Sequence, residues 1–200
     1  MPKKVKTQVT KDSWRAKEVF TVISPKYFGN SEIGNTVATS RDSVMGRILE
    51  TTLYDITGDI SLIHVKIKLQ INDVQGNKAY TIFKGHDFTR DYLRSLVRRG
   101  STRIDGRFSV VTKDGYNMIV SVTAFSNSRA KTSQEQTIRK IMQETVNKKA
   151  SELNFEQFVH EAVLGKVGSE IYNQAKKVLP LRKCEVRKSK LVSTTATASS

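Results

Sequence analysis

The sequence predicts an α+β protein in which an antiparallel, β-barrel-like sheet carries one inserted basic helix and is followed by a C-terminal group of about three helices. Two observations support this. From about Glu18 to Phe125 apolar residues recur at every second position, as in half-buried strands, and after Phe125 they recur at every third or fourth position, as in helices. A third observation concerns the termini, which have too few apolar residues to pack. The 200 residues suffice for one domain with a helical appendage.

The clearest strand lies in SLIHVKIKLQIN, where residues 63, 65, 67, 69 and 71 are all apolar and share one face. Similar alternation predicts strands near EVFTVIS, SVMGRILETTL, KAYTIFK, TRIDGRFSVVT and YNMIVSVTAFS. The segments NDVQGN and Lys113-Asp114-Gly115 have the composition of turns. Strands at this spacing, joined by short turns, are typical of an antiparallel sheet that curls toward a barrel.

One helix interrupts the strands at about residues 87–99. Phe88, Tyr92, Leu93, Leu96 and Val97 form an apolar stripe, and the stripe stops just before a glycine at position 100, which suits a helix C-terminus.

Three further helices are predicted in the C-terminal part of the chain. Ser133 with Gln136, and Asn154 with Gln157, resemble capping boxes ahead of apolar stripes. A third helix is predicted to run from Ser169 to Leu179-Pro180, since proline disfavours helical geometry in the preceding residue. The alternating segment RKCEVRKSKLV is expected to return to the sheet.

The chain thus divides into a basic extension (1–17), a β-barrel-like domain (18–126), a helical region with a returning strand (127–192) and a tail (193–200). The tail and the N-terminal extension are expected to be disordered on their own.

The charge points to a polyanionic partner. There are 34 Lys and Arg against 19 Asp and Glu, giving a net charge of +15 and a pI near 10.0. Residues 1–17, 90–107, 127–149 and 176–190 carry net charges of +5, +4, +4 and +6, so the rest of the chain is acidic. Charge gathered in separate blocks favours binding over mere solvation, and nucleic acid is the first partner to consider.

The strongest local pattern is the spacing of Arg90, Arg94 and Arg98, which would place three guanidinium groups along one face of the predicted helix. Planar guanidinium groups match phosphate oxygens in pairs. Neutralisation by Asp87 and Asp91 is the alternative for any single arginine. The full set of predicted RNA-contacting residues is Lys3, Lys4, Lys6, Lys11, Arg15, Arg90, Arg94, Arg98, Arg99, Arg103, Arg129, Lys131, Arg139, Lys140, Arg182, Arg187 and Lys188.

No catalytic residue, metal site or cofactor is predicted. One cysteine and three scattered histidines provide no metal-ligand spacing. His86 and Asp87 are interpreted as capping and turn residues, and Cys184 as packed against the sheet. No run of about 18 apolar residues occurs, so a cytoplasmic protein with no membrane partner is expected.

Several separated motifs resemble the archaeal and eukaryotic small-subunit ribosomal protein family S-three-A-e, also called eS-one, over roughly residues 14–192. These are IGNT, GRILETTLYDITGD, DVQGNKAYTIFKGHDFTRDYLRSLVRRGSTRID, TKDGY, QTIRKIMQE and VLPLRKCEVRKSKL, and the chain resembles the archaeal members. The resemblance implies a β-barrel domain with attached helices. It also implies a place on the platform of the small subunit, near the 3′ end of its rRNA and the mRNA exit, beside other platform proteins, and no enzymatic activity.

The leading hypothesis is therefore a structural constituent of the small ribosomal subunit that binds rRNA through several basic surfaces and supports translation. The alternative is a free single-stranded nucleic-acid-binding barrel protein, which would show aromatic side chains on an exposed strand face. An RNA-modifying enzyme would need an acid-base or metal cluster that the sequence does not offer.

Overall fold

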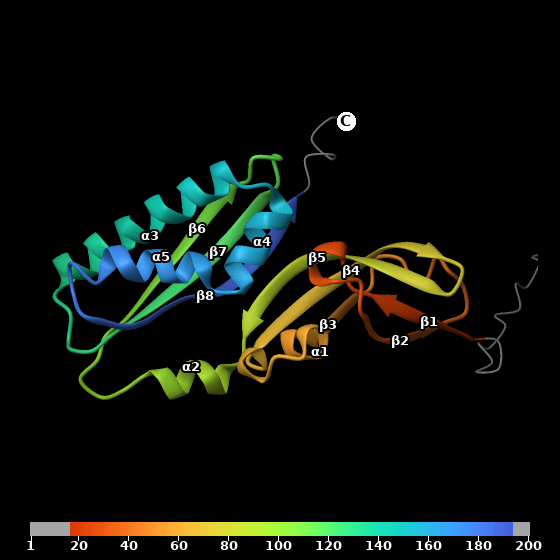
Figure 1. The fold of residues 1–200 in the computed structure, drawn as a ribbon, viewed down its shortest axis with the longest axis horizontal. Helices are drawn as coiled ribbons and strands as arrows, with labels where there is room; N and C mark the ends of the chain where they lie inside the picture. Colours follow the sequence, from red (N-terminus) through yellow and green to blue (C-terminus); the bar gives the residue numbers. More distant parts are fainter. Residues whose placement is uncertain (1–16, 194–200) are drawn as a thin grey trace, which may run out of the picture.

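The computed structural model describes residues 17–193 and has the mixed α+β architecture predicted from the sequence, with eight strands in one sheet and five α-helices (Figure 1). The strands are β1 (Glu18–Ile23), β2 (Glu32–Ala38), β3 (Ile48–Thr52), β4 (Val65–Gln75), β5 (Lys78–Phe88), β6 (Arg103–Val111), β7 (Asn117–Ser126) and β8 (Leu181–Ser193). The helices are α1 (Leu53–Thr57), α2 (Arg90–Leu96), α3 (Thr132–Glu152), α4 (Phe155–Val163) and α5 (Lys166–Ala175), with short 3-10 turns η2 (Lys26–Phe28) and η3 (Ile60–Leu62).

Strand β5 connects the two parts of the sheet. It pairs antiparallel with β4 along most of its length, parallel with β1 over three residues at its start, and antiparallel with β8 at its end. Strand β8 then pairs with β7, and β7 with the edge strand β6. The returning C-terminal strand predicted from the sequence is confirmed, and it lies inside the sheet rather than at its edge.

The sheet is not closed, so the expected barrel-like shape is not confirmed. Strand β2 pairs only with β1, and β3 only with β4. A groove of about 420 Å³ lies between the two and is lined by residues of both. Across this gap Arg47 donates from Nη1 to the carbonyl of Val37 at 3.0 Å, in place of strand pairing. Alternation shows which side chains a strand buries, and it carries no information about which edges meet.

Helices α3, α4 and α5 cover one face of β6, β7 and β8 (Figure 1). The three predicted helices are therefore present, but two begin elsewhere. Lys131, not Ser133, is the N-cap of α3, and its backbone N–H donates to Gln134 Oε1 at 3.0 Å. Helix α5 begins at Lys166 instead of Ser169. A capping-box pattern depends only on residues that are close in sequence. The first residues of α3 and α5 depend also on where these helices pack on the sheet.

The inserted helix is shorter than predicted. Strand β5 continues to Phe88, so His86 and Asp87 lie in a strand and the capping and turn roles expected for them are wrong. At the other end Val97 has extended backbone angles, which leaves Arg98 beyond the helix. Phe88 is buried from the end of strand β5. Its position just before the helix happens to continue the apolar stripe of the helix, and for this reason the sequence pattern predicts too early a start for the helix.

The contact between β5 and β8 is close and depends on two neighbouring residues. Gly85 faces Lys190, and a Cβ atom at Gly85 would lie 2.5 Å from the carbonyl oxygen of Ser189. His86 is buried, with Nε2 2.9 Å from the carbonyl oxygen of Val186 and Nδ1 2.6 Å from Ser189 Oγ. A carbonyl can only accept, so Nε2 carries the proton and Nδ1 accepts from the hydroxyl. Burial lowers the pKa of His86 to about 4, which keeps the ring neutral.

Most of the predicted helices and strands lie within the described residues, whereas both predicted tails lie largely outside them. Nothing is described for residues 1–16 or 194–200, so the disorder expected there stays a prediction, except that Ser193 ends β8. The division into an extension, a sheet domain, a helical region and a tail also stays a prediction.

We expect Gly85→Ala to destabilise the protein by about 1–3 kcal/mol, because the added methyl group forces two paired backbones apart. Gly34→Ala in strand β2 is the matched control, since its Cβ would meet nothing within 4 Å, and we expect a change below about 1 kcal/mol. Urea unfolding of both variants measures the difference. Equal stabilities would contradict a close β5–β8 contact.

We expect His86 to make stability depend on pH. The unfolded ring binds a proton near pH 6.5 and the folded ring only near pH 4, so its contribution is complete above pH 6.5 and is lost as pH falls toward 4. The loss amounts to about 3 kcal/mol. In His86→Gln this component should disappear, whereas His160→Gln should retain it. Urea midpoints at pH 7, 5.5 and 4.5 provide the test, and identical pH profiles for His86→Gln and wild type would refute the assignment.

Candidate nucleic-acid interface

Three loops that are far apart in the sequence meet at one end of the molecule. They comprise residues 97–103, 127–131 and 176–182, and we call them the basic end. Thr102 joins the first two loops, because its Oγ1 accepts from the N–H of Ala130 at 3.0 Å. The N–H of Asn127 donates to the carbonyl of Pro180 at 3.1 Å, and Arg182 donates from Nη1 to the carbonyl of Leu96 at 3.4 Å. One backbone pair, the hydroxyl of Thr102 and the guanidinium of Arg182 thus fix the three loops against one another.

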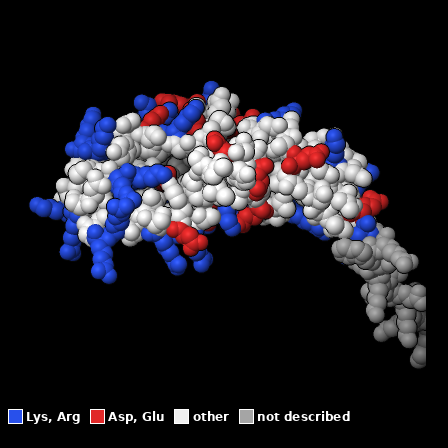
Figure 2. Space-filling view, turned by 60° about the horizontal axis from the view of Figure 1, so that its bottom comes forward, with Lys and Arg blue, Asp and Glu red and all other residues white. Residues whose placement is uncertain are grey.

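The basic end carries only positive charge. Its three loops contribute three, two and three cations, and none of them contains an Asp or Glu. All eight side chains are exposed, and long basic side chains crowd the left-hand end of the molecule in Figure 2. Among the described residues, only Arg103 of this set forms an ion pair, with Asp105 at 3.0 Å. The eight cations are Arg98, Arg99, Arg103, Arg129, Lys131, Lys176, Lys177 and Arg182.

The three arginines predicted to lie along one helix face do not form a row. Arg94 is exposed on α2, while Arg98 belongs to the basic end and lies beyond the helix. Arg90 lines a groove of about 550 Å³ between α2, β4, β5 and β8. The predicted spacing assumed three helical turns, and the helix has seven residues.

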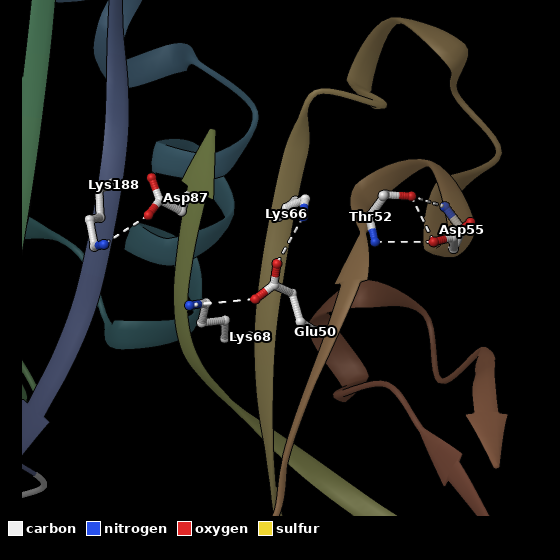
Figure 3. Close-up of polar contacts among 7 residues, drawn as sticks. All are labelled: Glu50, Thr52, Asp55, Lys66, Lys68, Asp87 and Lys188. Carbon is white, nitrogen blue, oxygen red and sulfur yellow. Dashed lines mark hydrogen bonds and ion pairs between the residues drawn. The ribbon is translucent and has the colours of Figure 1, made fainter. Parts of the chain in front are cut away.

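That groove has mixed charge, as Figure 3 shows. Glu50 pairs with Lys66 Nζ at 3.1 Å and with Lys68 Nζ at 3.5 Å, and Asp87 pairs with Lys188 Nζ at 2.8 Å. The hydrogen bond from Lys66 lowers the pKa of Glu50, so this carboxylate stays ionised. The groove therefore holds cations that are partly neutralised by neighbouring acids, unlike the basic end.

A second concave surface lies along β8 and has no acidic residue in its lining, although its Lys188 also lines the mixed groove and pairs there with Asp87. It encloses about 430 Å³ and is lined by Arg107, Arg187, Lys188 and Lys190 together with Ile119 and Ser121. The Nε atom of Arg187 is buried and has no hydrogen-bond acceptor among the described residues. We call this surface the β8 pocket. Its cations converge because β6, β7 and β8 are neighbours and present these residues on the face opposite the helices.

Sequence reasoning leaves out several of these cations. Lys176, Lys177 and Lys190 are absent from the predicted set although all three lie on the two basic surfaces. The alternation in β8 places Lys188 and Lys190 on one face, and this signal would have found Lys190.

The remaining predicted residues have other surroundings. Arg139 pairs with Glu135 at 3.2 Å and donates to the carbonyl of Asp105, so it already bridges α3 and β6. Lys140 is exposed on α3. Lys3, Lys4, Lys6, Lys11 and Arg15 lie outside the described residues.

Residues 17–193 contain no group of three His, Cys, Asp or Glu side chains that could hold a metal ion. Cys184 is buried against the helices, as predicted for a residue packed on the sheet, and burial raises the pKa of its thiol to about 12. Within the same residues, no helix is long and apolar enough to cross a membrane.

The chain is similar to ribosomal proteins along nearly its whole length. It is 48% identical over 192 residues to "Small ribosomal subunit protein eS1" of Staphylothermus marinus, covering 96% of this chain and 90% of that protein. It is 47% identical over 184 residues to the protein of the same name from Desulfurococcus amylolyticus, covering 92% and 86%. For the Sulfurisphaera tokodaii protein the identity is 46% over 182 residues, covering 91% and 94%. The model of the Ribosomal S3Ae family matches residues 5–195, and the chain therefore belongs to that family, as its motifs indicated.

Proposed function

We propose that this protein is a structural constituent of the small ribosomal subunit and binds rRNA through the basic end and the β8 pocket. The observation that carries the proposal is the meeting of eight exposed cations from three loops, with no carboxylate in any of them. Membership of a ribosomal protein family supports a structural role and not an enzymatic one.

The geometry favours recognition of the phosphate backbone. Five of the eight cations are arginines, whose planar guanidinium groups bind phosphate oxygens in pairs. Two of the hydrogen bonds that hold the loops join neutral groups, and of the eight cations Arg103 and Arg182 also contact the protein, through Asp105 and the carbonyl of Leu96. Contacts of this kind position RNA by shape and charge and need no base sequence.

Two separate basic surfaces suit two separate RNA segments. The basic end lies at the tip of the β6–β8 sheet, and the β8 pocket lies on the open face of that sheet. A protein that holds two segments fixes the distance between them, which is a structural role in an RNA-protein particle. The mixed groove is a weaker candidate, since Glu50 and Asp87 neutralise part of its charge.

The family resemblance supports a finer location. We propose that the chain lies on the platform of the small subunit, near the 3′ end of the rRNA and the mRNA exit, beside other platform proteins in the cytoplasm. Hydroxyl-radical cleavage of rRNA from probes attached at Lys177 would test this location, and cleavage confined to another region of the subunit would contradict it.

The main test uses the variant Arg98→Ala/Arg99→Ala/Arg129→Ala/Lys131→Ala. We expect weaker binding to small-subunit rRNA and a log–log salt dependence that is shallower by about 3, because each lost phosphate contact removes about 0.7–0.9 from the slope. Fluorescence anisotropy between low and high salt measures both quantities.

The matched control is Lys26→Ala/Arg41→Ala/Lys78→Ala/Lys166→Ala, which removes four exposed cations elsewhere in the molecule. Both variants change the net charge equally, so only a local interface predicts a difference between them. Equal losses would show that the net charge alone drives binding. A wild-type protein that leaves the small subunit in a high-salt wash would favour the free nucleic-acid-binding alternative.

A further inference from the structure

A surface of opposite character lies on α1 and η3, away from the basic end (Figure 1). Ile60 is 73% exposed, the most of any large hydrophobic side chain among the described residues, and Ile63 and Tyr54 are 54% and 39% exposed. In a 3-10 turn, side chains at positions i and i+3 project on the same side, so Ile60 and Ile63 form one apolar ridge. We call Tyr54, Asp55, Asp59, Ile60 and Ile63 the α1–η3 surface.

The exposure of these residues is not a result of a loosely held segment. Thr52 and Asp55 form a complete capping box at the start of α1, with Thr52 Oγ1 donating to Asp55 Oδ2 at 2.7 Å (Figure 3). Leu53 is fully buried, and Ile56 and Leu62 pack against the core. The same short segment therefore turns three apolar residues inward and three others outward, and backbone hydrogen bonds from Leu62 and Ile63 close the η3 turn. A pre-ordered apolar ridge loses little conformational entropy when a partner covers it.

The charge of this region excludes a polyanion. Residues 48–65 form the longest stretch of the sequence without Lys or Arg, and they contain Glu50, Asp55 and Asp59. The adjoining groove between β2 and β3 is lined by Glu50 and Asp55 and by a single cation, Lys66, which is paired with Glu50. Phosphates would be repelled here, whereas a cationic protein would be attracted.

We propose that the α1–η3 surface is the docking site for a basic protein segment with apolar side chains, which packs on Ile60 and Ile63 while its Lys or Arg residues face Asp55 and Asp59. This inference rests on the proposed function, because the partner is a protein of the assembled small subunit. A protein that shares an RNA-rich particle with this chain needs cations of its own to bind phosphate, so basic segments are the expected partners there. The chain then uses opposite charges for two classes of partner, RNA at the basic end and protein at α1–η3.

The test places a photo-crosslinker at the ridge. Full-length Ile60→Cys is labelled with benzophenone maleimide, and the buried Cys184, the sole native cysteine, stays unlabelled. The labelled chain is reconstituted with small-subunit rRNA and total small-subunit proteins and then irradiated. We expect crosslinks that survive ribonuclease and contain a basic protein identified by mass spectrometry. Val111→Cys, 56% exposed on β6, is the matched position outside the α1–η3 surface and should give a different product.

Charge and apolar contact are tested together by adding Asp59→Lys/Ile63→Ser to the labelled chain. Asp59 makes no capping hydrogen bond, so the change leaves the turn intact. We expect the protein crosslink to fall by about tenfold, as for the loss of an interface hot spot, with affinity for naked rRNA not reduced. The control pair Asp42→Lys/Val111→Ser should leave the crosslink unchanged.

The outcomes separate this inference from the function on which it rests. Crosslinks from position 60 to rRNA would overturn the inference alone, and so would equal thiol-labelling rates at position 60 in the free chain and in the subunit. Failure of the unlabelled wild-type chain to enter the subunit would overturn both.

Discussion

The pairing of β8 between β5 and β7 joins two parts of the chain that would otherwise form separate sheets. His86 and Ser189 are 103 positions apart and share a hydrogen bond, and Gly85 lets the two backbones approach. Closing a loop of this length has a high entropic cost, which the buried, fully hydrogen-bonded contact must offset. Neutral His86 suits this site because it accepts from one residue of β8 and donates to another, so the ring fixes the register of the strand.

The basic surfaces follow from the same pairing. Strand β8 places its own cations beside Arg107 of β6 and forms the β8 pocket. Because β7 and β8 are antiparallel, the loop after β7 and the loop before β8 lie at the same end, where the segment between α2 and β6 also arrives. Three of the charged blocks are far apart in the sequence, and sheet topology alone brings parts of them together.

Local patterns predicted local structure well in this chain. Alternation identified β4, and Val65, Ile67, Leu69 and Ile71 are all buried, because a strand at the core must present every second residue to it. Ile63, predicted on the same face, lies before the strand and is 54% exposed, so that part of the prediction is wrong. The open sheet and the short α2 could not be predicted in the same way. Both depend on which strands form hydrogen bonds with each other. Phe88, which pairs with Val65 of β4, would fit the apolar stripe of a helix as well as the buried face of a strand. The candidate site was predicted as blocks of charge, but its grouping into the basic end, the β8 pocket and a neutralised groove needed the fold.

The arrangement of charges shows how the basic loops are held in place in a protein with a net charge of +15. Ion pairs would be the usual means of holding basic loops together, but they would also neutralise the cations and weaken in salt. Here backbone groups, the hydroxyl of Thr102 and the guanidinium of Arg182 hold the loops, and among the described residues Arg103 is the one cation of the basic end that pairs with a carboxylate. Repulsion among the exposed cations is moderate in water because of its high dielectric constant, and phosphate removes it on binding. The fold thus largely separates the groups that stabilise the loops from the groups that bind, and Arg182 belongs to both.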